Sequence, residues 1–440
     1  MTMASSAASS WSHKLKWSAF RALEALSDLK GNETAGQLDV EIPATPKAAL
    51  WVFASTIGEL NAVEPLLRTL HQRSQHLQLV LISDHAHYRD SYRSRYPGAV
   101  FCVTRGHSRD ASALVRHYPP KALVIAEIPC YPAEAPCRFS SAFVFAAKNA
   151  GAQVAIINGW LYGYAPACKL DDLERRLLAV DYLSAIDTIC AQTEEVAQTL
   201  IDLGSPANNI HVVGNLKFDA MQQPGWTPAN SKCPKLLTDL IESQRPVIVA
   251  GCMTDEDEQQ RAIAAFARLK QSQPDALLVL APRHPEVAAN MQTIDAQLKA
   301  HTLTYSLRSS IADHPIPGEQ ACLVLDTMGE LRDFYAVSAV AHVGVDHNVL
   351  EPLGFEKRVT VSPGWNSTYP SYPVYSLLHA QSVLNEAHTA DELYAAWLTH
   401  LQPGKQKHDH EQARAVLATL RGATDRHLNV LNNLLQALDR

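Results

Sequence analysis

Short apolar segments recur along most of the chain, and stretches of helical periodicity separate them. After Ala48 the apolar segments are ALWVFAS, LQLVLIS, AVFCV, KALVIAEI, AQVAIIN, TICAQ and IHVVGN. Buried strands that alternate with helices are typical of parallel βαβ units, in which both faces of the sheet are covered. The pattern therefore predicts an α/β chain.

One stretch interrupts this alternation. Residues 222–234, QQPGWTPANSKCP, contain three prolines and a glycine, a composition that favours a linker. The alternation then resumes with PVIVAG, ALLVLAP, ACLVLD, AVAHVG, RVTVSP and AQSVLN. We therefore predict a Rossmann-like domain over residues 49–221, a linker over 222–234, a second Rossmann-like domain over 235–400 and a helical segment over 401–440. A length of 440 residues also fits two domains better than one.

Residues 1–48 precede the first strand and contain one amphipathic helix. Its apolar side chains recur at helical spacing at Trp11, Leu15, Ala19, Ala22, Leu26 and Leu29, and Phe20 and Leu23 widen that face. Lys14, Lys16 and Arg21 make the first half of this helix basic. Residues 11–30 are therefore either an interfacial helix that contacts anionic lipid or a helix docked on its own domain, and we favour docking.

The composition narrows the function classes. Hydrophobic residues make up 47% of the chain and charged residues 19%, and the formal net charge is −7, so a nucleic-acid binder with a basic surface is not expected. The eight cysteines form no CxxC motif and are expected to be buried thiols in a reducing compartment. No segment has the pattern of a membrane span or a signal peptide, so we expect a cytoplasmic protein.

Polar turns follow two strands of the first half. The turn STIGE ends at Glu59, where Gly58 is expected to allow a tight strand-to-helix turn. Glu59 is either a general base or the capping glutamate of the next helix, since a helix start favours a carboxylate. The turn GNLKFD places Lys217 where it either meets an anionic group or lies in a solvated turn.

Three further polar turns follow strands of the second half. PRHPE displays Arg283 and His284 between two prolines, and a rigid arginine suits phosphate or carboxylate recognition. DTMGEL is a strand-to-helix turn whose amides either hold a phosphate or are capped by a side chain. HNVLEP places Glu351 four residues after His347, where it either binds ribose hydroxyls or begins a helix.

Several other kinds of site are disfavoured. The chain has no GxxxxGK[ST] motif and no GxGxxG motif followed by a ribose-binding acid, so neither a P-loop nucleotidase nor a dinucleotide-dependent dehydrogenase is expected. The histidines show no metal-ligand spacing, and the acidic run at Asp255 and Asp257 is better explained as a helix start. No metal site is therefore predicted.

Taken in order, these motifs resemble those of the 3-deoxy-D-manno-octulosonic acid (Kdo) transferases, glycosyltransferase family 30, whose members have the GT-B fold. The similarity spans about residues 49–400. The motifs that carry it are TIGE at 56–59, EIPCYP at 127–132, NGW at 158–160, GNLKFD at 214–219, PRHPE at 282–286, DTMGEL at 326–331 and HNVLEP at 347–352.

The resemblance implies two Rossmann-like domains whose parallel sheets face each other across a cleft. It implies an inverting, metal-independent transferase that moves Kdo or a Kdo-like sugar acid from a CMP-activated donor to an acceptor hydroxyl, without a further cofactor. The implied catalytic base is Glu59. The implied donor site comprises Arg283, His284, Thr327, Met328, Gly329, Glu330, Asn348 and Glu351. The implied acceptor side, for a glycan or a lipid-linked sugar, comprises Thr56, Gly58, Glu127, Asn158 and Lys217.

The chain also departs from the family pattern. Pro129 stands where the family has a second acid, and the family's Asn-Ala-Arg segment ends here at Trp160. The loop before His347 is shortened, and residues 252–258 replace the family's Ser-Thr-His segment. Two alternatives therefore remain beside the Kdo transferase: a GT-B enzyme with a UDP donor or epimerase activity, and a catalytically silent nucleotide-binding relative. A membrane-associated Kdo transferase would lie at the cytoplasmic face of the inner membrane.

Overall fold

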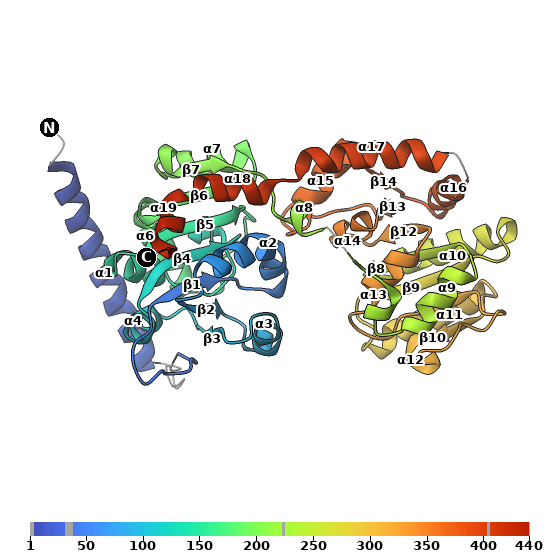
Figure 1. Cartoon of the computed structure of the whole chain (residues 1–440), viewed down its shortest axis with the longest axis horizontal. Helices are drawn as coiled ribbons and strands as arrows, with labels where there is room; N and C mark the ends of the chain where they lie inside the picture. Colours follow the sequence, from blue (N-terminus) through green and yellow to red (C-terminus); the bar gives the residue numbers. More distant parts are fainter. Residues whose placement is uncertain (1–3, 31–37, 222–224, 403–404, 440) are drawn as a thin grey trace. The chain divides into compact units, whose positions relative to one another are not determined.

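The chain folds into two compact units, each built on its own sheet (Figure 1). The computed structural model describes residues 4–30, 38–221, 225–402 and 405–439. Unit 1 comprises Met1–Ala220 together with Leu420–Arg440, and unit 2 comprises Met221–Thr419. The expected linker 222–234 begins at this division, although its first three residues lie outside the described part of the chain.

Unit 1 is a seven-stranded parallel sheet in the order β3-β2-β1-β4-β5-β6-β7. Its strands are β1 (Ala49–Phe53), β2 (Gln78–Ser83), β3 (Val100–Val103), β4 (Pro120–Ala126), β5 (Gln153–Gly159), β6 (Thr188–Ala191) and β7 (Ile210–Val212). All seven coincide with the predicted apolar segments. Every residue of β1 is buried, because helices cover both faces of the sheet.

Helices form a layer on each face of this sheet. One layer contains α4 (Ser108–His117), α5 (Ala142–Asn149), α6 (Lys169–Ala185) and α7 (Glu194–Asp202). The other contains α2 (Ile57–Arg73), α3 (Arg89–Arg95), α18 (Ala423–Val430) and α19 (Asn432–Leu438), with the short α8 (Lys217–Ala220) beside α2. The one-turn 3-10 helices of this unit are Ala86–Tyr88, Pro132–Glu134 and Ala207–Asn209.

The C-terminal segment was predicted only as a helical region over 401–440. In the structure its end returns to unit 1, where α19 covers β4 and β5 and α18 contacts β6 (Figure 1, red). Leu431, Leu434 and Leu438 are almost fully buried in the same core as Leu66 of α2. The first domain is therefore completed by residues far away in the sequence.

The N-terminal helix α1 (Ala4–Lys30) lies along the outside of the α4–α6 layer. It is docked on its own unit, but among the described side chains of the predicted apolar face Phe20 alone is buried. Trp17 and Phe20 face the domain, whereas Leu15 and Leu26 of the stripe are exposed. Periodicity located the apolar stripe correctly but could not show which side of the helix packs inward. The side chains of Trp11 and Leu29 lie outside the described residues.

Unit 2 has a seven-stranded parallel sheet in the order β10-β11-β9-β8-β12-β13-β14. Its strands are β8 (Val247–Met253), β9 (Leu277–Pro282), β10 (Tyr305–Leu307), β11 (Cys322–Val324), β12 (Val340–Val343), β13 (Arg358–Val361) and β14 (Leu384–Glu386). Six of these were predicted. The sequence pattern missed β10, because this edge strand is half-buried and only three residues long.

The helices of unit 2 are α9 (Pro234–Glu242), α10 (Glu256–Ser272), α11 (Ala288–Ala300), α12 (Arg308–Ile311), α13 (Leu331–Val337), α14 (Leu350–Gly354), α15 (Tyr372–Ala380), α16 (Ala390–Leu401) and α17 (Lys405–Leu420), with a 3-10 turn at Pro228–Asn230. Asp255 caps α10, so the acidic run there is the helix start that the sequence indicated. Among the described residues, no helix combines the length and apolarity needed to cross a bilayer.

The cysteines are free thiols in both units. Most are buried, as the sequence predicted, and Cys252 is half-buried. Cys168 is exposed at the start of α6, because the strand-to-helix connection before it runs over the surface. The expectation of buried thiols is therefore wrong at Cys168 and only partly met at Cys252.

Candidate active site

The first set of predicted residues lies at the carboxyl edge of the unit 1 sheet. β1 and β4 are neighbours in the sheet, and the chain leaves β1 toward β2 on the other side. Such a reversal of strand order opens a crevice at the carboxyl ends of the two strands, where α/β proteins bind their ligands. The Glu59 turn follows β1 and Glu127 follows β4, so the fold brings two predicted residues to this point.

Glu59 lies in the first turn of α2 and is almost completely buried, with 8% of its surface exposed. Its Oε2 accepts a hydrogen bond from the Ser55 amide at 2.9 Å, and its Oε1 accepts one from Thr56 Oγ1 at 3.1 Å. Thr56 also caps the helix by accepting from the Glu59 amide at 3.3 Å. Glu59 therefore makes the contacts of a capping glutamate. These contacts fix the carboxylate in position and leave its use as a base open.

The electrostatics of Glu59 favour the protonated form. Burial raises the pKa of this carboxyl well above its ordinary value, and the negative charge of Glu127 raises the pKa further. A carboxyl with a raised pKa can accept a proton near neutral pH. Gly58 is not required by the turn, because an added Cβ would meet only Thr56 Oγ1, at 3.7 Å. The steric reason expected for this glycine is therefore wrong.

Asp84, at the end of β2, holds the Glu59 turn against the neighbouring loops. Its Oδ1 accepts from Ser55 Oγ at 2.6 Å, and its Oδ2 accepts from the Arg138 amide at 2.8 Å. Tyr92 donates to the carbonyl of Thr56 at 3.0 Å. These contacts connect segments far apart in the sequence, and no motif signalled them. The backbone around Glu59 is consequently constrained from several sides.

Glu127 forms a buried ion pair with Lys217, with 2.7 Å between Oε1 and Nζ. The Tyr162 hydroxyl donates to the same carboxylate. Glu127 has a φ of 62°, a left-handed conformation that costs free energy in a non-glycine residue. The predicted pair Glu127 and Lys217 is thus assembled in one place, and Tyr162 is an additional member that sequence reasoning missed.

Asn158 connects three strand ends of unit 1. Gln192 Nε2 donates to the backbone carbonyl of Asn158 at 2.9 Å, and Asn158 Oδ1 accepts from the Leu216 backbone amide at 2.9 Å. Its own backbone N–H donates to Nε2 of His427, on α18, at 3.1 Å. Asn158 Nδ2 is buried without a partner in the described part of the chain, so it can donate to a bound group.

In unit 2 the corresponding switch point lies between β8 and β12. Arg283, at the end of β9, donates to Nε2 of His347 at 2.7 Å and lies 3.5 Å from the Tyr369 hydroxyl. His347 in turn donates from Nδ1 to the carbonyl of Val345 at 2.6 Å. His347 therefore orients the guanidinium of Arg283, whose planar set of donors suits a phosphate. His284 is exposed and pairs with Glu286 at 3.0 Å instead.

The turn at residues 326–330 is held from within unit 2. Glu330 pairs with Arg308 at 3.0 Å, and both side chains are 6% exposed. Thr327 donates to the same carboxylate. Met328 is exposed, and its carbonyl accepts from Lys232 at 2.9 Å, while Gly329 has a φ of 77°. The carboxylate of Glu330 therefore holds this turn in shape.

The last predicted turn begins helix α14. Asn348 Oδ1 accepts from the Leu350 amide at 3.0 Å. Burial raises the pKa of Glu351, and the positive charge of Arg332 partly opposes that rise. Glu258, in the first turn of α10, accepts from the Val345 amide at 2.7 Å and so fixes the loop before His347. In the described part of the chain, no group of His, Cys, Asp and Glu is arranged to hold a metal ion.

Known proteins agree with this arrangement of motifs. The model of the 3-deoxy-D-manno-octulosonic-acid transferase (kdotransferase) family matches residues 30–220, which end where the first segment of unit 1 ends. A Kdo transferase of Haemophilus influenzae is 26% identical over 403 residues, which cover 89% of this chain and 88% of that protein. One from Bordetella pertussis is 26% identical over 430 residues, which cover 91% and 90%.

Over most of its length the chain is similar to Kdo transferases.

Solved structures are similar to this chain in fold. The UDP-GlcNAc 2-epimerase of Neisseria meningitidis, bound to UDP-GlcNAc, matches 88% of this chain and all of its own chain, with a TM-score of 0.56 and 13% identity. An α,α-trehalose-phosphate synthase (UDP-forming) of Burkholderia vietnamiensis matches 89% of this chain and all of its own, with a TM-score of 0.51 and 12% identity. Such low identities show the two-domain Rossmann-like fold alone. The similarity to Kdo transferases indicates that the chain is a glycosyltransferase.

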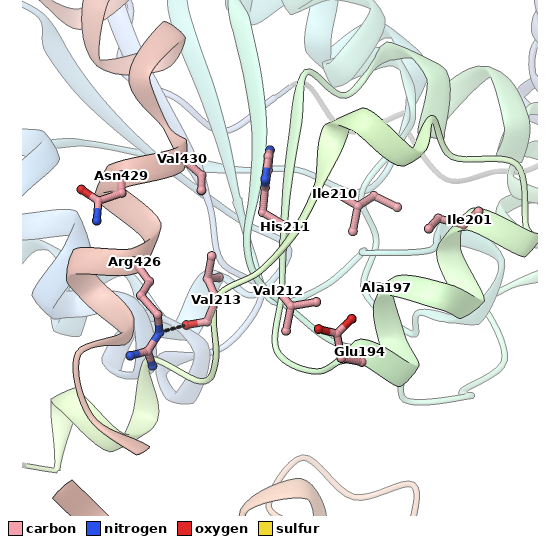
Figure 2. Close-up of a pocket in the computed structure, with 10 residues that line it drawn as sticks. All are labelled: Glu194, Ala197, Ile201, Ile210, His211, Val212, Val213, Arg426, Asn429 and Val430. Atoms are coloured by element: carbon pink, nitrogen blue, oxygen red, sulfur yellow. Dashed lines mark hydrogen bonds between the residues drawn. The ribbon is translucent and has the colours of Figure 1, made fainter. Parts of the chain in front are cut away.

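Unit 1 also has a groove away from these residues (Figure 2). It measures about 550 Å³ and lies beside the edge strand β7, between α7 and α18. Ile210, Val212 and Val430 give it an apolar lining, and Arg426 donates to the carbonyl of Val213 at 2.8 Å. None of the predicted site residues of this transferase lines it, so the groove is separate from the candidate active site.

Asn158 is hydrogen-bonded to Gln192, Leu216 and His427, and His427 is the partner farthest from it in the sequence. Replacement of His427 by phenylalanine tests these contacts. The Nδ1–H of His427 donates to the Ala423 carbonyl at 2.7 Å, so Nε2 is free to accept from the Asn158 amide. Phenylalanine would leave that buried amide unpaired, and we expect a loss of about 1–3 kcal/mol in the stability of unit 1. Thermal unfolding against His314→Phe, an exposed control, measures the loss.

The pH dependence of unfolding gives a second readout for His427. Burial lowers the pKa of His427 from 6.5 to about 4, so the unfolded state binds more protons between these two pH values. The contribution of the neutral ring is therefore present above pH 6.5 and is lost as the pH falls toward 4. We expect the free energy of unfolding of the His427→Phe variant to fall less steeply than that of the native chain between pH 6.5 and pH 4. An unchanged acid limb would contradict the proposed burial of a neutral ring.

Proposed function

We propose that the chain transfers Kdo or a Kdo-like sugar acid from a CMP-activated donor to an acceptor hydroxyl, by an inverting reaction that requires no metal ion. The observation that carries this proposal is the match to Kdo transferases over about 90% of both chains, with the family's motifs at or after the carboxyl ends of strands in both sheets. Synthesis of lipopolysaccharide or a related glycan is the corresponding role.

The proposed step is a single displacement at the anomeric carbon. The acceptor oxygen forms the new bond to that carbon and gives its proton to the Glu59 carboxylate. The bond between the anomeric carbon and the phosphate oxygen breaks, and CMP leaves with the electron pair. Attack from the face opposite CMP inverts the configuration. The raised pKa of Glu59 suits it to take this proton, and the constrained turn keeps its carboxylate in place.

Residues of unit 2 would hold and stabilise the nucleotide. Arg283, oriented by His347, is placed to bind the phosphate whose negative charge grows as CMP leaves. Asn348 and Glu351 would bind the ribose, and the turn at 327–330 would contact the nucleotide through its backbone. In unit 1, Asn158 and Lys217 would bind the acceptor. We further propose that the acceptor is a lipid-linked glycan, which places the reaction at the cytoplasmic face of a membrane.

Thermal unfolding with nucleotides tests the donor class. CMP at 100 times its Kd should stabilise the binding unit by about 2.7 kcal/mol, whereas UDP and GDP at the same concentration should have little effect. Arg283→Gln should weaken CMP binding by roughly 10- to 100-fold, because one charged hydrogen-bond partner of the phosphate is lost. Arg268→Gln, an exposed arginine paired with Asp391, is the matched control. Stabilisation by UDP and none by CMP would contradict the proposal.

Incubation with CMP-Kdo and a panel of acceptors tests the reaction itself. Mass spectrometry should detect CMP release together with an acceptor heavier by one Kdo residue. The same assay separates the alternatives. A UDP-sugar that is converted while CMP-Kdo is not would indicate a UDP-dependent GT-B enzyme or an epimerase, and CMP binding without product would indicate a silent relative.

A further inference from the structure

Helix α1 packs on unit 1 through one side only. Trp17 meets Phe145 of α5 edge to face, with 5.6 Å between ring centroids, and Phe20 is 1% exposed. Both aromatic residues lie on the inward side of the helix. The packing that holds α1 in place therefore does not use Leu15, Leu23 or Leu26.

The opposite side of α1 presents those leucines to solvent. Leu15 is 68% exposed, Leu23 46% and Leu26 55%, and the alanines Ala19 and Ala22 between them are exposed too. Isolated exposed leucines are common on protein surfaces. A continuous stripe of them along a helix, with small residues between, is instead typical of a binding surface.

The charges of α1 are divided between the same two sides. Its two acids point inward, where the Ser108 amide donates to Glu24 at 2.9 Å and Asp28 pairs with His107 at 3.1 Å. Lys14 and Arg21 are exposed beside the leucine stripe and form no ion pair with a described residue. The outward surface of the helix is thus apolar and cationic, with no acid on it.

A neighbouring helix extends this outward surface. Lys16 of α1 pairs with Asp181 of α6 at 2.9 Å, which places the two helices side by side. α6 exposes Leu173 and Val180, which lie seven residues apart and therefore on one side of that helix. Two adjacent helices on the outside of unit 1 consequently carry exposed apolar residues.

We propose that the outward surface of α1 binds the interface of an anionic lipid membrane, with the leucines inserted below the headgroups and the two cations against lipid phosphates. An amphipathic helix with leucines on one side and lysine or arginine beside them is the structure that lies in this interface. A second copy of the chain fits less well, because pairing two such stripes would bring the same cations from both copies together. The inference does not depend on the identity of the donor sugar.

Vesicle sedimentation of the full chain tests this surface without donor or acceptor. The protein should pellet with vesicles of equal parts phosphatidylcholine and phosphatidylglycerol, less so in high salt, and poorly with phosphatidylcholine alone. The triple change Leu15→Gln, Leu23→Gln and Leu26→Gln keeps good helix formers and should lower binding by roughly 100-fold. The double change Lys14→Gln and Arg21→Gln should lower binding to anionic vesicles by roughly 20- to 30-fold.

A matched control uses apolar residues of unit 2 that are similarly exposed. The triple change Ile241→Gln, Val287→Gln and Leu377→Gln should leave vesicle binding unchanged. An unaltered thermal midpoint of each variant shows that folding is intact. The proposal fails if the native chain does not pellet with anionic vesicles, or if the α1 triple variant pellets equally well. Light scattering that shows a dimer lost in the α1 variant, without vesicle binding, would assign the stripe to a second copy instead.

Discussion

Glu59→Gln should abolish transfer, with a loss of roughly 10²- to 10⁴-fold in rate, while the fold and CMP binding are retained. Glutamine keeps the size of the side chain, and its amide oxygen can still accept from the Ser55 amide, so the start of α2 should be preserved. It cannot take a proton from an acceptor hydroxyl. CMP release and product mass measure transfer, and the nucleotide-dependent rise in thermal midpoint measures binding.

Glu392→Gln is the matched control for this substitution. Glu392 lies at the start of α16, where Thr389 accepts from its amide at 3.1 Å and its Oε2 accepts from the His388 amide at 2.8 Å. It therefore has the same capping geometry as Glu59, at a helix start outside the predicted site. We expect Glu392→Gln to keep full activity. Full activity in Glu59→Gln as well would restrict Glu59 to its capping role.

The pH profile provides an independent readout of Glu59. A base acts when deprotonated, so the rate should rise with pH through the raised pKa of this carboxyl. Glu127→Gln removes a negative charge that raises that pKa, so the rise should move to lower pH. The contribution of Glu59 to folding stability changes in the opposite direction from the rate as the pH rises. The folded state keeps a proton on this carboxyl at pH values where the unfolded state has lost it. Unfolding free energy from Glu59 therefore falls as pH increases above the ordinary carboxyl pKa.

Removal of residues 420–440 should unfold unit 1 while unit 2 remains folded. This segment buries Leu431, Leu434, Leu435 and Leu438 against the sheet. At about 1.5–3 kcal/mol for each leucine, their burial contributes about 6–12 kcal/mol, which is comparable to the stability of a whole domain. Calorimetry should show the loss of one unfolding transition and the survival of the other.

Single substitutions in the same segment should destabilise unit 1 by a smaller amount than its removal. Leu434→Ala should cost about 2–5 kcal/mol in the unit 1 transition, because it leaves a cavity in the core. Asn433→Ala, on the exposed side of the same helix, should change that transition little. A truncated chain that keeps both transitions would show that α18 and α19 are dispensable for unit 1.

The strands were the most predictable part of the fold. Apolar segments such as ALWVFAS are buried on both sides of the sheet, so their composition alone identifies them. The half-buried edge strand at Tyr305 gave no such signal. The stripe on α1 shows a different limit, since periodicity locates an apolar surface but cannot show what covers it. Nothing in the sequence indicated that α19 belongs to the core of unit 1.

The candidate site was predictable where its residues follow strands. Glu59, Glu127 and Lys217 all lie at strand ends, and parallel topology brings such ends to one edge of the sheet. Gln192 directly follows a strand and was available to the same reasoning. Tyr162 and His427 were not, because a loop residue and a C-terminal helix reach the site only through tertiary packing.

The return of α18 and α19 to unit 1 has a consequence for the order of assembly during translation. Leu420 leaves the ribosome 200 residues after Ala220, a delay of roughly 10 to 40 s at ordinary rates of synthesis. During that interval β4 and β5 lack the helix that covers one of their faces, and the nascent chain exposes an apolar surface to chaperones. Unit 2, which is continuous in sequence, can reach its native state first, so the domain whose synthesis begins earlier is the one completed later.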